Sequence, residues 1–107
     1  MMKQITSRAE FQRRLDRALV DAATLLARSP NFDPYQQIEL QLRTLKQWTQ
    51  NGREPTPEER KRITIGRIMA REFDPQPEGW LQTIMDNLYD IQGYVTVWPP
   101  EGEAPYK

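Results

Sequence analysis

Hydrophobic positions near the start of the chain recur at the spacing of one helix face. The i, i+4, i+7, i+8 pattern predicts an amphipathic helix over about residues 7–28. Ser7 and Glu10 have the spacing of a capping box just ahead of this pattern, and Ser29 with Pro30 ends it. The apolar face of this helix consists of Phe11, Leu15, Ala18, Leu19, Ala22, Leu25 and Leu26.

A second helix is predicted over about residues 34–50. Asp33 is suited to the N-cap, and Pro34 fits the first helical position, where a missing amide costs nothing. Leu40 lies off the apolar face and Trp48 lies at its margin. Either this helix is packed on two sides, or these two residues contact a partner. The apolar face itself consists of Tyr35, Ile38, Leu42 and Leu45.

A third helix is predicted over about residues 57–73. Thr56 fits the N-cap, Pro57 the first position, and Glu59 completes a capping box. Gly66 lies inside this helix, where it costs helix propensity but allows a second helix to approach closely. The apolar face consists of Ile65, Ile68, Met69 and Phe73.

The fourth predicted helix covers about residues 75–92. Asp74 and Pro75 repeat the cap and proline pattern, Pro77 is still tolerated in the first turn, and Gly93 ends the helix. Its buried stripe is expected to contain Trp80, Leu81, Ile84, Leu88 and Ile91.

Residues 94–107 change in character. Tyr94 to Trp98 alternates like a strand, but one short segment has no evident pairing partner and Pro99-Pro100 stops it. We therefore expect an extended arm that lies on the helices and frays after Pro100. The fold class predicted is all-α, a single domain over residues 1–107 built as an antiparallel four-helix bundle with an extended C-terminal arm.

The amino-acid composition argues against nucleic acid and membranes as partners. The 107 residues include fifteen Lys plus Arg and fifteen Asp plus Glu, so no net field attracts the chain to nucleic acid or to a membrane surface. The charges are uneven, because Arg53 to Arg71 is basic and the residues after it are mostly acidic. The first residues lack the apolar core of a signal peptide, and no stretch is long enough to span a membrane, so we expect a cytoplasmic protein.

The sequence offers little catalytic chemistry. It has no Cys and no His, which removes thiolate nucleophiles, imidazole bases and the usual zinc ligands, and it has no phosphate-binding glycine loop. We therefore expect no enzyme activity, no metal and no cofactor. The remaining enzymatic hypothesis is a hydrolase that uses Glu72, or Asp86 with Asp90, and it requires these acids to converge in one cleft.

Two charged features of the third helix each allow two interpretations. Arg60, Thr64, Arg67 and Arg71 share one side, which indicates either an ion-paired solvent face or a surface for an anion or an acidic partner. Glu72 lies within the apolar stripe, so it is either part of an ion pair at the edge of the core or a buried charge that marks a site.

The fourth helix and the residues after it carry a different surface. Asp86, Tyr89 and Asp90 lie away from the apolar centre of the helix, and Tyr94 with Trp98 extends the set if the arm lies alongside. Acids flanked by aromatic side chains suit a cationic pocket on another protein. Packing onto the bundle is the alternative role for Tyr94 and Trp98.

The chain resembles a known family. The run "ITIGRIMAREFDPQPEGWLQTIMDNLYDI", preceded by "FQRRLDRALVDAATLLARSPNF" and "QIELQLRTLKQW", resembles the small helical immunity proteins that protect bacteria against NAD(P)-hydrolysing effectors delivered by type VI secretion. The resemblance covers about Phe11 to Tyr94. Its sharpest element consists of Gly66, Ile68, Ala70, Glu72, Phe73, Asp74 and Pro77.

The resemblance implies a cytoplasmic, non-catalytic protein that binds a cognate toxin domain and blocks its active site. A non-inhibitory helical adaptor or effector chaperone is the alternative. A pocket that holds dinucleotide phosphates is expected to be cationic, which favours an acidic, aromatic plug. The predicted toxin-facing residues are Asp86, Tyr89, Asp90, Tyr94, Trp98 and Glu72, and the rival set is Trp48, Arg53, Arg67 and Arg71. The toxin's exact reaction and the oligomeric state stay open.

Overall fold

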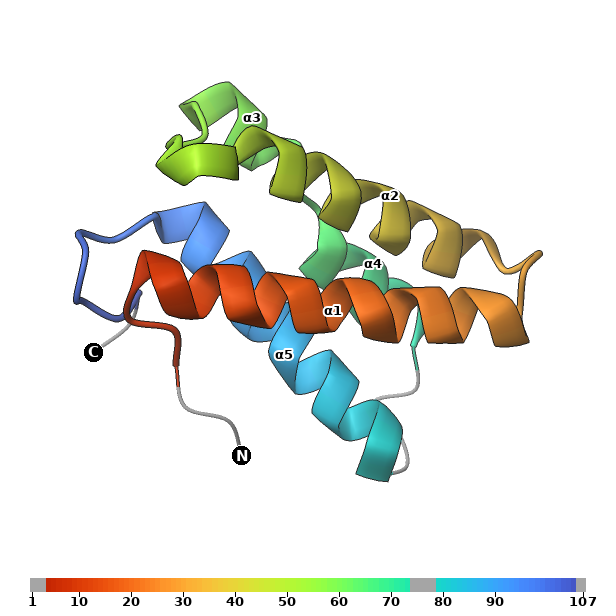
Figure 1. Cartoon of the computed structure of the whole chain (residues 1–107). Coiled ribbons are helices and arrows are strands. Elements are labelled where there is room, and N and C mark those ends of the chain that lie inside the picture. Colours follow the sequence, from red (N-terminus) through yellow and green to blue (C-terminus); the bar gives the residue numbers. More distant parts are fainter. Residues whose placement is uncertain (1–3, 74–78, 106–107) are drawn as a thin grey trace.

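The computed structural model describes residues 4–73 and 79–105, and in these ranges the chain is all-α with no strand (Figure 1). The predicted fold class is therefore confirmed. The helices are α1 (Arg8–Arg28), α2 (Asp33–Trp48), α3 (Pro57–Lys61), α4 (Ile65–Glu72) and α5 (Gly79–Val97), with a short 3₁₀ turn, η1 (Gln50–Gly52), after α2.

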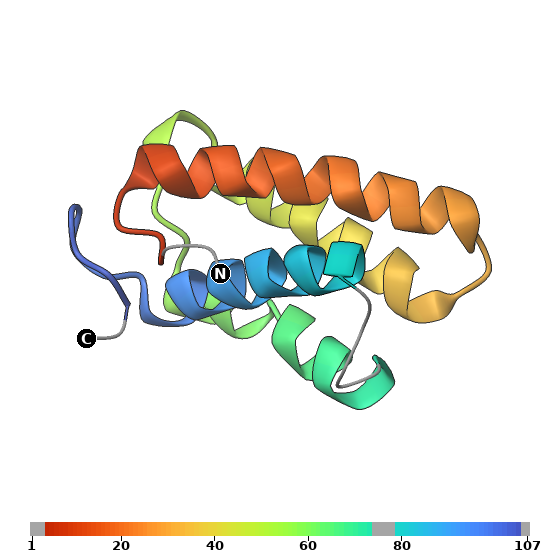
Figure 2. The ribbon, with the colours of Figure 1, turned by 90° about the horizontal axis from the view of Figure 1, so that it is seen from below.

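The helices pack as a bundle (Figures 1 and 2). Successive helices run in opposite directions when α3 and α4 are counted together as one segment. Helix α1 lies along α2, and α5 crosses beneath α1, with α4 packed against both α2 and α5. In the described ranges, no helix combines the length and the apolar character needed to cross a membrane.

The first two helices begin close to their predicted starts. Ser7 is the N-cap of α1, and its side-chain oxygen accepts from the backbone N–H of Glu10 at 3.0 Å. Helix α2 differs in detail, because Phe32 occupies the N-cap position and Asp33 is already the first helical residue. The predicted Asp33 cap is wrong, since no side chain caps this helix.

The predicted third helix is two helices. Its capping box is present, with Thr56 and Glu59 bonded reciprocally, but α3 ends at Lys61. Ile63 and Thr64 begin a β-branched run of low helix propensity, and Ile63 is buried in the core. The break is stabilised from outside, because α2 and α5 supply side chains to the backbone groups that it frees. Gln41 Oε1 accepts from Thr64 N–H at 2.7 Å, and Gln92 Nε2 donates to Ile63 O at 2.9 Å.

Helix α5 runs past its predicted end at Gly93. The predicted start at Asp74, Pro75 and Pro77 lies outside the described residues. At the other end, Tyr94 and Val95 are fully buried in the core, and the helix continues to Val97. The strand-like alternation is thus overridden by burial, and the arm described begins at Trp98.

The arm lies on the bundle, and Arg8 makes several of the contacts that hold it. Arg8 donates from its guanidinium to the hydroxyl of Tyr94 and, at 2.7 Å, to the carbonyl of Pro99. Its backbone N–H donates to Glu101 Oε1 at 2.9 Å, and the guanidinium lies 4.6 Å from the centre of the Trp98 ring. These contacts fix the arm to the start of α1.

The core follows most of the predicted stripes, and Trp80 departs from them. Trp80, expected inside, is 47 % exposed and stacks with Arg28 at the end of α1. Leu40 is also exposed, whereas Trp48 packs partly buried against the core. The fully buried side chains include Ile5, Phe11, Leu15, Ile38, Leu42, Leu45, Ile65, Met69, Leu88, Ile91, Tyr94 and Val95.

Candidate partner-binding surface

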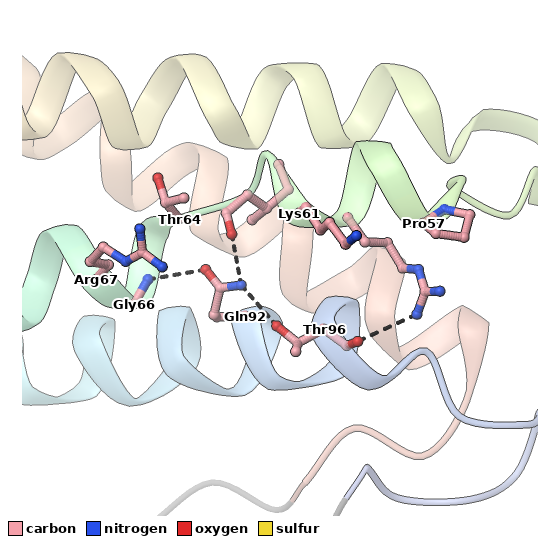
Figure 3. Close-up of a pocket in the computed structure, with 9 residues that line it drawn as sticks. Pro57, Lys61, Thr64, Gly66, Arg67, Gln92 and Thr96 are labelled. Carbon is pink, nitrogen blue, oxygen red and sulfur yellow. Dashed lines mark hydrogen bonds between the residues drawn. The ribbon is translucent and has the colours of Figure 1, made fainter.

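A groove of about 650 Å³ runs along the line where α3 and α4 meet α5 (Figure 3). We call it the basic groove. Both sides contribute side chains, with α3 and α4 on one wall and α5 on the other. Its polar lining consists of Arg60, Lys61, Thr64, Arg67, Gln92 and Thr96.

Gln92 ties the two walls together (Figure 3). Its Oε1 accepts from the backbone N–H of Gly66 at 3.1 Å, and its Nε2 donates to Ile63 O at 2.9 Å and to Thr96 Oγ1 at 3.0 Å. The walls are close because Gly66 has no side chain: a Cβ there would lie 3.2 Å from Gln92 Cγ. The neutral polar side chains of the groove are thus already hydrogen-bonded, Gln92 with Thr96 and Thr64 with Gln41 of α2.

The cationic side chains of the groove have fewer or longer hydrogen bonds than its neutral side chains. Arg60 Nη1 makes long bonds of 3.3 and 3.4 Å to the carbonyls of Thr96 and Val97, and its Nε is buried without a hydrogen-bond partner. Lys61 and Arg67 are exposed, and neither pairs with a carboxylate of residues 4–73 or 79–105. None of the described residues that line the groove is acidic, and three of them, Arg60, Lys61 and Arg67, are cationic.

Two residues of the predicted acidic and aromatic set have structural roles instead. Asp90 Oδ2 accepts from Arg14 Nη2 at 2.5 Å, and that arginine is itself buried. Tyr94 is fully buried and stacks on Phe11 with the ring centres 5.2 Å apart. Tyr94 therefore has no exposed surface in this structure, and its ring packs within the core.

The other members of that set differ in how accessible they are. Trp98 is partly buried, with its ring against Phe11. Asp86 accepts from Gln82 Nε2 at 2.7 Å but forms no ion pair within the described part of the chain. Tyr89 is 43 % exposed, and its Cδ1 lies 3.8 Å from the position that a Gly66 Cβ would take. Tyr89 is therefore an exposed aromatic side chain beside the basic groove.

Glu72 and the rival arginines are mostly paired. Glu72 is exposed and accepts from Arg71 Nε at 3.0 Å, as expected for an ion pair at the edge of the core. Arg53 pairs with Glu59 at 2.9 Å. Only Arg67 of the rival arginines lacks a carboxylate partner among the residues described. The structure thus brings Arg67 and Tyr89, from the two competing sets, to the same line of contact between α4 and α5.

The acids suggested for a hydrolase engage separate partners: Glu72 bonds Arg71, Asp86 bonds Gln82 and Asp90 bonds Arg14. Nor does the described part of the chain contain a group of three or more acids that could hold a metal ion. What this surface offers is charge and an exposed aromatic ring for binding.

Sequence reasoning missed Lys61, Gln92 and Thr96 as members of the candidate site. They lie on α3 and α5, and the periodicity within each helix does not say which helices are neighbours. The only available signal for Lys61 was its place in the basic segment that ends at Arg71.

The family of the chain is established by comparison with known protein families. The family model named Tsi6 matches residues 10–95, from the first turn of α1 to near the end of α5. The chain belongs to the Tsi6 family. Tsi6 proteins are immunity proteins of type VI secretion. The Tsi6 match includes Arg67, Tyr89 and the whole lining of the basic groove except Thr96. No curated protein and no solved structure gives a significant match to the chain.

Proposed function

We propose that this protein binds its cognate type VI effector, an NAD(P)-degrading toxin, and blocks the toxin's active site. The observation that carries the proposal is the match of residues 10–95 to the Tsi6 family. The NAD(P)-degrading class of the toxin rests on the resemblance of the run from Gly66 to Pro77. The geometry supports binding rather than chemistry, because the described surface combines an exposed tyrosine with unpaired charges.

The proposed effector-facing surface is the line of contact between α4 and α5, centred on Tyr89 with Asp86 one turn away. Tyrosine is enriched among the residues that dominate protein interfaces, because a large rigid ring is buried at little entropic cost. Asp90 and Tyr94 act from beneath this surface by holding α5 in place.

An inhibition assay tests this function. The cognate type VI effector is purified as its toxin domain, and consumption of NAD(P)⁺ is followed with increasing amounts of the full chain. We expect activity to fall to background at a one-to-one ratio, with a linear titration if binding is tight. A complex that forms while the toxin stays fully active would instead favour the adaptor or chaperone function.

A further inference from the structure

We infer that the basic groove receives an acidic segment of the partner, a stretch carrying at least two Asp or Glu side chains. This inference rests on the proposed function in taking the effector as the partner. It adds that the groove recognises carboxylates of the partner. The sequence-based expectation is the reverse arrangement, in which this protein offers an acidic surface to a cationic pocket of the toxin.

The ion pairs within the chain indicate that Lys61 and Arg67 are the groove residues able to bind a carboxylate of a partner. The chain has no net charge, and among the described residues seven other cations contact a carboxylate of their own molecule, while Arg8, Arg28 and Arg60 contact a carbonyl or an aromatic ring. Because like charges beside one another are costly without a partner, the two unpaired cations of the groove are available to a carboxylate from outside. The internal pairs are Arg13–Glu10, Arg14–Asp90, Arg17–Asp21, Arg43–Glu39, Lys46–Asp16, Arg53–Glu59 and Arg71–Glu72.

The groove is also organised before any partner arrives. Gln92 holds its two walls, and the carbonyls at the end of α5 hold Arg60 with its buried Nε unpartnered. Helix α4 begins at Ile65 beside the groove and has no acid in its first turn, so the positive end of its dipole is not neutralised by its own residues. A preorganised positive groove loses less entropy when it binds a carboxylate.

The lining favours an acidic peptide over a nucleotide or a nucleic acid. A groove of about 650 Å³ is large enough for several side chains. None of the described lining residues is aromatic, so they offer a base no ring on which to stack. The absence of net charge also removes the long-range attraction on which nucleic-acid binding depends.

Single charge reversals in the intact chain test the inference. Lys61→Glu and Arg67→Glu change the groove, and Arg62→Glu is the matched control, because Arg62 is exposed at the C-cap of α3 but is not among the residues that line the groove. Affinity for the effector's toxin domain is measured by calorimetry at several salt concentrations. We expect each groove variant to weaken binding by about tenfold or more and to reduce its salt dependence, whereas Arg62→Glu stays within about twofold. Melting temperatures of all three variants should match the wild type.

The results separate this inference from the proposed function. If the wild type binds the effector and all three variants bind equally well, the groove is not the site and the function stands. If the wild type does not bind the effector, the proposed function fails, and a hexaglutamate peptide with blocked ends replaces it as the probe. Amide shifts at Gly66 and Gln92 that disappear in Arg67→Glu would then support the groove, and their absence would overturn it.

Discussion

At the scale of single residues, Arg14 links α1 to α5. Its buried guanidinium donates at 2.5 Å both to Asn87 Oδ1 and to Asp90 Oδ2, and Asn87 Nδ2 donates back to the carbonyl of Arg14 at 3.0 Å. A buried guanidinium is tolerated only when such partners replace water. Asp90 is thus a structural residue that joins α5 to α1.

Replacing Asp90 should therefore lower stability. We expect Asp90→Ala to lower the free energy of unfolding by about 1 to 3 kcal/mol, because it removes a hydrogen bond to a charged, buried group. Asp86→Ala is the control, since Asp86 bonds only Gln82 within α5, and it should stay within about 0.5 kcal/mol of the wild type. Urea denaturation measures both values, and equal losses would contradict the assigned role.

Gly66 gives a second prediction at this scale. A leucine there would force side-chain atoms into Gln92 and Tyr89, since even a Cβ would lie 3.2 Å from Gln92 Cγ. We expect Gly66→Leu to lower the free energy of unfolding by about 1 to 3 kcal/mol through overpacking. The control is Gly79→Leu, because a Cβ at Gly79 meets no atom within 4 Å. Thermal melts that show the two variants equally stable would refute close packing at Gly66.

At the scale of elements, the division between α3 and α4 shows where local signals stop being sufficient. The capping box at Thr56 and Glu59 was readable from the sequence and is present. The break after it depends on Gln41 and Gln92, which reach the freed backbone groups from other helices. A helix is continuous only if its own hydrogen bonds outcompete such external partners.

The cap of α3 predicts a pH dependence. The pKa of Glu59 is lowered, mainly because its carboxylate accepts from the backbone N–H of Thr56 and also through Arg53, while desolvation acts in the opposite direction. A pKa lower in the folded than in the unfolded chain stabilises the fold above the unfolded value of about 4.3. This contribution is lost as the pH falls through the lowered pKa. Between about pH 5 and pH 3 the stability of Glu59→Gln should therefore fall less than that of the wild type; matching pH profiles would count against the cap.

At the scale of the whole molecule, the proposed surface is formed by three consecutive helices, α3, α4 and α5, whose side chains meet only when the helices pack together. Lys61 and Arg67 come from α3 and α4, and Tyr89 comes from α5. An interface that inhibits a toxin needs about 800 Å² on each partner, so the groove and Tyr89 must act with the surface around them. Within that area, a few anchors are expected to dominate affinity.

Tyr89 is the anchor that we predict. Tyr89→Ala should weaken effector binding by about tenfold or more without changing the melting temperature, because the ring is 43 % exposed and its loss leaves no core cavity. Leu40→Ala is the control, since Leu40 is 48 % exposed on α2, a helix with no residue among the described lining of the groove. Calorimetry against the toxin domain gives both affinities. If Leu40→Ala alone weakens binding, the effector contacts α2 instead.

The sequence by itself determined the all-α class, the caps at Ser7 and Thr56, most of the core stripes and the resemblance to type VI immunity proteins. The class, the caps and the stripes depend on hydrogen bonds between nearby residues and on a period of 3.6 residues. A short stretch of sequence is enough to reveal both. The tertiary structure alone decided that the third helix breaks after Lys61, that α5 continues through Tyr94, and that Asp90 is neutralised by Arg14. Each of these depends on a partner from a distant helix, because burial and long-range hydrogen bonds override local preference.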